Sequence, residues 1–195
     1  MHGPDFSERE IPVIALSRAQ SEGVVWGRSR LIVYAWGLVE WLLVTNALQI
    51  SSRIRVAALR AFGATIGERV IFRPRTRVRF PWKLTIGNDV WIGEGVWIHN
   101  QDHVTIGGDV VVSQETLLTT GSHRHRVDMA LVTSPITIED GAWVTSRCII
   151  TGGVTIGRSA LVAPMSVVTT SVPPADMVRG NPAIRFAERF DRKPQ

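Results

Sequence analysis

Cysteine is nearly absent from this 195-residue chain, whose only thiol is Cys148. A single cysteine excludes an internal disulfide framework and a CxxC metal clip, which suits a reducing compartment and predicts a cytoplasmic location. Charge of one sign is not concentrated either, since the 22 lysines and arginines are scattered from Arg9 to Lys193 among 17 acids. The net charge of +5 therefore predicts no nucleic-acid partner. An anionic cofactor, a nucleotide-linked sugar or a membrane surface remains compatible with it.

A secretory signal is not indicated, because the first residues, MHGPDFSEREIP, carry acids and lack a basic region before an apolar stretch. Long apolar runs are few, and the main one covers residues 31–50, with Arg28 and Arg30 before it and Trp36 and Trp41 within it. Three interpretations stay open for this run. It could span a bilayer, cap the end of the fold as a helix or helix pair, or make peripheral membrane contact.

A six-residue period dominates the chain beyond residue 62. An apolar residue recurs at the positions Ile66, Phe72, Val78, Ile86, Ile92, Ile98, Ile106, Val112, Leu118, Ile138, Val144, Ile150, Ile156, Val162 and Val168. Small or apolar residues also stand two places before many of these, at Val90, Val96, Val104, Val110, Thr116, Ala142, Cys148, Val154, Ala160 and Ser166. Residues two apart on a strand share a face, so each hexad predicts one short strand with two inward side chains, followed by a turn.

Three such hexads make one triangular coil, and stacked coils pair at the usual strand spacing of about 4.8 Å. The sequence therefore predicts an all-β solenoid, a left-handed parallel β-helix of hexapeptide repeats. Glycines that follow the aliphatic position, such as Gly87 and Gly107, are expected at tight corners. The period slips by two residues at 78–86 and at 98–106, which predicts small insertions at one corner of successive coils.

The step from Leu118 to Ile138 is 20 residues, which predicts a loop over residues 121–135 that protrudes from the frame. We expect three parts in all. Residues 1–62 form a helical appendage that is capping or membrane-proximal, residues 63–172 form the β-helix with its inserted loop, and residues 173–195 form a C-terminal tail.

Histidine in the inserted loop is the main candidate for chemistry. The loop contains His123 and His125, and an imidazole can accept a proton near neutral pH because its free pKa is about 6.5. A solvated, merely basic loop is the alternative. With His99 and His103 on the preceding coil, the loop histidines also raise a zinc hypothesis of the γ-class carbonic anhydrase kind, although their spacing does not favour it.

Two other residue types have ordinary structural explanations. We expect Cys148 to point inward as a small core residue, without a nucleophilic role. Trp91, Trp97 and Trp143 each precede an inward position, where the chain is expected to turn, so they would cover corners.

Several segments resemble the hexapeptide-repeat acyltransferases, and within them the exopolysaccharide O-acetyltransferases of the colanic acid biosynthesis type. The likeness covers most of the chain, and its segments are FGATIGERVIFRP, FPWKLTIGNDVWIGEGVWIHN, VTIGGDVVVSQETLLTTGSH, SPITIEDGAWV and SVPPADMVRGNPA. The TGSH segment and the terminal GNPA are more specific than the hexads, which nucleotidyltransferases and carbonic anhydrases share. The resemblance implies an O-acetyltransferase that moves an acetyl group from acetyl-CoA to a sugar hydroxyl in exopolysaccharide or glycolipid assembly, without a required metal.

Site residues follow from the resemblance position by position. His123 of TGSH corresponds to the general base, and Asn100 and Asp128 are expected on the acceptor side. The family's coenzyme groove implies a larger set, namely Trp143, Ser146, Pro164, Thr169, Thr170, Arg179, Gly180, Asn181 and Arg185. Family sites lie between subunits, so a homotrimer is implied. A sugar or a lipid-linked saccharide would be the acceptor, at the inner face of a membrane if the apolar run makes contact there.

The chain departs from the family pattern at three positions. Arg124 follows His123 where the family has aspartate, and Asp128 is the nearest candidate to replace that carboxylate. Pro164 stands where a backbone donor to pantetheine is usual, and proline has none. Thr170 replaces a lysine that would meet coenzyme phosphate, leaving Arg179, Arg185 or Arg189 as substitutes. These departures keep open a third interpretation, a β-helix that serves as a non-catalytic scaffold.

Overall fold

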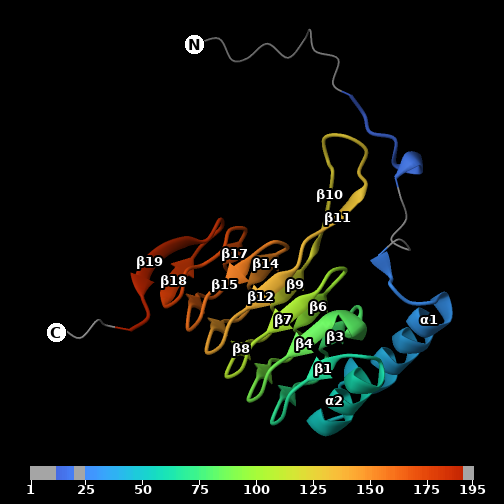
Figure 1. The fold of residues 1–195 in the computed structure, drawn as a ribbon, viewed down its shortest axis with the longest axis horizontal. Coiled ribbons are helices and arrows are strands. Elements are labelled where there is room, and N and C mark those ends of the chain that lie inside the picture. The colour runs from blue at the N-terminus through green and yellow to red at the C-terminus, as the bar shows by residue number, and fades with distance from the viewer. Residues whose placement is uncertain (1–11, 20–24, 191–195) are drawn as a thin grey trace.

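Short parallel strands stack into a three-faced solenoid in the computed structural model, which describes residues 12–19 and 25–190 (Figure 1). The first face consists of β1 (Thr65–Ile66), β4 (Leu84–Ile86), β7 (Val104–Ile106), β12 (Ile136–Ile138) and β15 (Thr155–Ile156). The second consists of β2 (Ile71–Phe72), β5 (Trp91–Ile92), β8 (Val111–Val112), β13 (Trp143–Val144), β16 (Leu161–Val162), β18 (Asp176–Arg179) and β19 (Ile184–Glu188). The third consists of β3 (Arg77–Val78), β6 (Trp97–His99), β9 (Leu117–Thr119), β14 (Ile149–Thr151) and β17 (Val167–Val168).

The hexad period is confirmed by burial. All fifteen apolar hexad positions are buried, and so are all ten residues two places before them, including Cys148. Register explains why: Ile86 pairs with Ile106, which pairs with Ile138, so equivalent hexad positions stack in columns along the axis. The prediction of a left-handed parallel β-helix is thus correct.

Glycine follows the inward residue where two coils approach each other most closely. A Cβ added to Gly87 would lie 2.7 Å from the backbone nitrogen of Gly108 on the next coil, a distance that no real Cβ tolerates. Gly87 and Gly107 lie on the edge between the first and second faces, so the predicted tight corner is confirmed.

The prediction that three tryptophans cover corners of the solenoid is wrong. Trp91, Trp97 and Trp143 lie within strands β5, β6 and β13, at outward positions of the flat faces. The alternation of a strand explains this, because the residue before an inward side chain must point outward.

All three irregularities of the period lie on one edge, between the third face and the first face of the next coil. We call this the insertion edge; it contains residues 79–83, 100–103 and 120–135. A single 3-10 turn, η4 (Pro81–Lys83), occupies the first insertion. The longest insertion is not an irregular loop. It forms an antiparallel hairpin of β10 (Gly121–His123) and β11 (Leu131–Thr133), which projects from the solenoid in Figure 1.

The N-terminal helices close the open end of the solenoid, after a short turn η1 (Leu16–Arg18). They are α1 (Arg30–Val39), the π-helical η3 (Glu40–Val44) and α2 (Ser52–Ala61). Within the described residues, no helix is both long and apolar enough to cross a membrane.

Each edge strand of the first coil receives hydrogen bonds from these helices. On β3, the Val78 N–H donates to Glu40 Oε1 at 2.6 Å and the Val78 carbonyl accepts from Trp36 Nε1 at 2.8 Å. Near β2, the Phe72 N–H donates to Ser52 Oγ at 2.8 Å. On β1, the Ile66 carbonyl accepts from Arg60. The cap thereby satisfies backbone groups that an open sheet edge would leave unpaired.

The far end of the solenoid continues beyond residue 172, where the period predicted a tail. Strand β18 still pairs in parallel with β16, since Val178 is the register partner of Val162. Strand β19 then folds back antiparallel onto β18. The C-terminal segment is therefore an integral part of the second face up to residue 188.

Candidate active site

The hairpin places one imidazole at its rim with a defined orientation. His123 is the last residue of β10, is exposed, and pairs in register with Leu131 of β11. Its Nδ1 lies 2.8 Å from the carbonyl oxygen of Met129. A carbonyl oxygen can only accept, so Nδ1 carries the proton and donates it in this bond. Nε2 is then unprotonated in the neutral ring, which makes it the atom available to take a proton.

The turn of the hairpin fixes the carbonyl that orients His123. Arg124 N–H donates to the Ala130 carbonyl at 3.0 Å, and the Arg124 carbonyl accepts from the Met129 N–H at 3.2 Å. Asp128 accepts from the Ala130 N–H at 3.0 Å and forms an ion pair with Arg124. These bonds, the Ala130 N–H first, lower the pKa of the Asp128 carboxyl.

Asp128 therefore does not replace the missing family carboxylate by touching the imidazole. It shapes the turn, and the Met129 carbonyl holds His123 instead.

Asn100 does not face a site in this chain. Its side chain is fully buried on the insertion edge. The amide accepts from the Phe80 N–H at 2.9 Å and donates to the Phe80 carbonyl at 2.7 Å and to the Lys83 carbonyl at 3.2 Å. As placed, Asn100 braces the neighbouring insertion and has no exposed atom, and its acceptor-side role stays a prediction.

Two of the expected coenzyme positions lie on the edge between the second and third faces, which we call the groove edge, residues 73–76, 93–96, 113–116, 145–148 and 163–166. Ser146 and Pro164 line a cavity of about 360 Å³ there, together with Gln114 and Met165. Trp143, on β13 just before this edge, is 40 % exposed. The side chains Trp143 and Ser146 are thus accessible from the same side of the solenoid.

Backbone donors at this corner are already used. The Ala163 N–H donates to the Val178 carbonyl at 2.9 Å, and the Met165 N–H donates to the Ser146 carbonyl at 3.0 Å. Pro164, between them, has no N–H. A ligand on this corner therefore has to be held through side chains and carbonyl oxygens.

The remaining expected coenzyme positions are divided between two edges. Thr169 and Thr170 are exposed on the insertion edge, the same edge as the hairpin. Arg179 is the last residue of β18, and Gly180 and Asn181 follow it at the end of the groove edge.

The three candidate phosphate partners differ in their freedom. Arg189 donates to the Gly141 carbonyl at 2.8 Å and to the Ser159 carbonyl at 3.2 Å. Arg179 lies over the Phe186 ring at 4.7 Å from its centroid. Arg185 is engaged with Asp176 at 2.8 Å and with Glu188, and its bond to Asp176 raises the pKa of the guanidinium. Arg179 is therefore the freest cation for a phosphate.

Within one chain, the oriented histidine and the groove edge do not meet. The third face separates the edges, because the chain crosses it between Ser146 and Gly152. The hairpin of β10 and β11, whose strand β10 ends at His123, projects from the body of the solenoid (Figure 1). A site that uses both edges requires a second copy of the chain.

The described residues contain no set of side chains that could hold a metal ion. Across residues 12–19 and 25–190, no three His, Cys, Asp or Glu side chains converge as a metal site would need. His99 packs edge-on against Trp97, with centroids 5.2 Å apart. Burial raises the pKa of the Cys148 thiol, which opposes formation of a reactive thiolate.

Sequence reasoning missed two groups that the structure brings into the site. The Met129 carbonyl carries no side-chain signal. Ser113 and Gln114 were overlooked because they stand in an ordinary hexad turn, yet Trp143 Nε1 donates to Ser113 Oγ at 3.0 Å and Ser146 Oγ donates to Gln114 Oε1 at 2.8 Å.

Comparison with known proteins gives named relatives, although no family model matches the chain. The protein named colanic acid biosynthesis acetyltransferase WcaF of Escherichia coli is 36 % identical over 166 residues, 85 % of this chain and 91 % of WcaF. The galactoside O-acetyltransferase of Escherichia coli is 30 % identical over 142 residues, 71 % of this chain and 70 % of that enzyme.

A solved structure is also similar. The hexapeptide-repeat acetyltransferase VCA0836 of Vibrio cholerae, crystallised with acetyl coenzyme A, has a TM-score of 0.76 at 27 % identity. The likeness covers 88 % of this chain and 100 % of that one.

Proposed function

Because this chain belongs to the hexapeptide-repeat acetyltransferases and uses acetyl-CoA as its donor, we propose that the acceptor is a saccharide hydroxyl. Two relatives support a saccharide, since one is named for colanic acid biosynthesis and the other for galactoside O-acetylation. The reaction then belongs to exopolysaccharide or glycolipid assembly, with a free or lipid-linked saccharide as the acceptor.

The observation that carries this proposal is the hydrogen bond from His123 Nδ1 to the Met129 carbonyl. It leaves Nε2 free to remove the proton of the acceptor hydroxyl as the new O–C bond forms at the acetyl carbonyl. The C–S bond breaks in the collapse that follows, and the imidazolium returns its proton to the departing sulfur. The Met129 carbonyl also stabilises the imidazolium form of His123, because the Nδ1–H of the ring stays hydrogen-bonded to it.

Acetyl-CoA supplies the activated acetyl group and is proposed to bind along the groove edge. Trp143 offers an exposed ring, and Ser146 and the cavity beside Pro164 offer polar and apolar surface. Arg179 is the candidate partner of coenzyme phosphate, in the place of the absent lysine. No metal is required by these steps.

A homotrimer is proposed, because the base and the groove lie on different edges of one solenoid. A ring of three chains can set the insertion edge of each chain against the groove edge of the next. The exposed His123 on a projecting hairpin supports this arrangement, because it extends away from its own solenoid.

Replacement of His123 by alanine tests the proposed base. We expect kcat to fall by about 10² to 10⁴, the usual contribution of general acid–base catalysis, with little change in the KM for acetyl-CoA. His125→Ala is the matched control, since His125 is exposed in the same hairpin turn and should retain activity. Normal turnover by His123→Ala would show that another group is the base. Failure of the wild type to bind acetyl-CoA would instead favour a scaffold.

We also propose that the enzyme works in the cytoplasm at the inner face of a membrane. Leu31, Tyr34, Leu38 and Trp41 are 57 to 79 % exposed and are spaced three and four residues apart, which places them on the side of the helix away from buried Trp36. Arg28 and Arg30 precede this stripe and suit an anionic lipid surface. Such a position would bring the enzyme to lipid-linked acceptors.

A further inference from the structure

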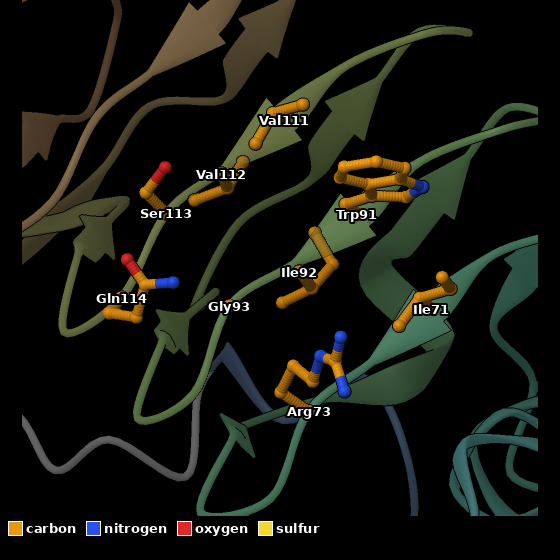
Figure 2. A pocket seen from close by; sticks show the side chains of 9 residues that line it. All are labelled: Ile71, Arg73, Trp91, Ile92, Gly93, Val111, Val112, Ser113 and Gln114. Atoms are coloured by element: carbon orange, nitrogen blue, oxygen red, sulfur yellow. The ribbon is translucent and has the colours of Figure 1, made fainter.

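A second cavity lies on the first coils of the solenoid, apart from the positions expected to hold coenzyme. It has a volume of about 280 Å³ and lies over the second face and the start of the groove edge. Figure 2 shows its lining from three successive coils, with Arg73 from the first, Trp91 from the second, and Ser113 and Gln114 from the third. Its volume is near the lower end for small-molecule sites, which suits a ligand the size of one sugar unit.

This cavity adjoins the proposed coenzyme groove. Gln114 lines both cavities. Two hydrogen bonds join their walls, from Trp143 Nε1 to Ser113 Oγ and from Ser146 Oγ to Gln114 Oε1. The groove edge therefore presents one continuous surface with coenzyme positions at its C-terminal coils and this cavity at its N-terminal coils. A second substrate placed here would lie next to the donor.

Arg73 is the unusual residue of the cavity because its guanidinium has neither an acidic nor an aromatic partner among the described residues. Across the described coils of the solenoid, the other arginines have partners. Arg69 pairs with Asp89, Arg75 with Glu94, Arg147 with Glu115 and Arg158 with Asp140, whereas Arg77 lies over Trp97, Arg79 lies near Phe80 and Arg179 lies over Phe186. The Arg73 side chain is exposed, and its guanidinium has no hydrogen-bond, ion-pair or ring partner among the residues described.

Trp91 gives the same cavity an aromatic wall. The side chain is 58 % exposed although it lies in mid-strand, between its register partners Ile71 and Val111. Its indole N–H has no hydrogen-bond partner within the described chain. A broad exposed ring with a free donor fits a sugar, whose C–H face is apolar and whose rim carries hydroxyl oxygens.

We propose that this cavity binds the acceptor and selects a saccharide that carries a negative charge. The sugar packs on Trp91, and a carboxylate or phosphate oxygen accepts hydrogen bonds from the Arg73 guanidinium, which presents paired donors to such groups. This assignment rests on the proposed function, because it needs a saccharide acceptor. The anion can come from a uronic acid or from a phosphate attached to the sugar, as in nucleotide-linked and lipid-linked forms.

The test compares three acceptors that share one sugar: a neutral methyl glycoside, the matching uronic acid glycoside, and the glycosyl phosphate. With wild-type enzyme, we expect kcat/KM to be higher for at least one anionic acceptor than for the neutral one. Arg73→Gln should lower kcat/KM for that anionic acceptor by about ten- to a hundredfold, the usual effect of losing a charged hydrogen bond. The neutral acceptor and the KM for acetyl-CoA should be unchanged. The anionic acceptor whose kcat/KM falls in Arg73→Gln shows whether the charge comes from a uronic acid or from a phosphate.

Two variants control this experiment. Arg75→Gln removes the same charge from the same corner, but Arg75 is paired with Glu94 at 3.2 Å, so it should not alter acceptor preference. Trp91→Ala should raise the KM of charged and neutral acceptors alike. The proposal is overturned if Arg73→Gln and Arg75→Gln have equal effects on the anionic acceptors.

A different result would show that the proposed saccharide acetyltransferase function is wrong. In that case, no saccharide of the panel is acetylated, although calorimetry shows that acetyl-CoA binds. Calorimetry with the same saccharides then tests independently whether the cavity binds an anionic sugar. Binding that depends on Arg73 supports the proposed cavity site, and absence of binding overturns it.

Discussion

If two inactive variants recover activity when they assemble into mixed trimers, each active site is built from two copies of the chain. The two variants are His123→Ala, which removes the proposed base from the insertion edge, and Ser146→Tyr, which fills the cavity on the groove edge. Each homotrimer should be inactive. In a mixed trimer, a site works only where an intact His123 faces an intact groove on the next chain.

The expected magnitude follows from ring closure. Trimers that contain both variants have either two chains of one and one of the other, and each arrangement has one junction of the right order. Mixed trimers should therefore recover about one third of wild-type activity. If each site were built within one chain, every site would lack one of the two parts and the mixture would stay inactive.

Two different affinity tags on co-expressed chains isolate the mixed trimers, and thiol release from acetyl-CoA with a saccharide acceptor measures their activity. Mixed trimers that carry His123→Ala on both kinds of chain serve as the blank. Activity no greater than this blank would refute the shared site, as would a purified protein that is monomeric in solution.

Two further predictions concern the N-terminal helices. Burial raises the pKa of Glu40, so its protonated form is favoured by folding and the associated stability is lost as pH rises through the folded-state pKa. Glu40→Gln keeps an acceptor for the Val78 N–H, so its melting temperature should rise relative to wild type as the pH increases above the unfolded-state pKa of about 4.3. Glu40→Ala, which removes that acceptor, should lose about 1 to 3 kcal/mol of unfolding free energy. The opposite trend for the glutamine variant would mean that attraction to nearby arginines dominates. The double variant Leu38→Glu, Trp41→Glu should no longer sediment with anionic vesicles at low salt, while its turnover of a soluble acceptor stays unchanged. Undiminished vesicle binding by this variant would exclude the exposed apolar stripe of the N-terminal helices as the membrane contact.

The sequence alone determined the frame of this protein. A period of six with two inward residues per repeat is local information, because alternation along a strand and a turn after it depend on neighbouring residues. Stacking then follows, since columns such as Ile86, Ile106 and Ile138 can be buried only against each other. The slips in the period also predicted that the two small insertions share one edge, and they do.

Only the tertiary structure decided what holds the site. The residue that orients His123 acts through its backbone carbonyl, which no side-chain pattern reveals. Asn100 was expected beside the acceptor, but its orientation depends on the insertion of the preceding coil, to which it is bonded. The tryptophans were expected at corners, and strand alternation turned them onto the faces.

The separation of His123 from the groove edge likewise depends on which side of the prism each residue reaches. The freedom of Arg73 depends on which acids its neighbours have already engaged. Both are relations between residues on different coils and edges, and such relations are fixed only when the coils are stacked in space.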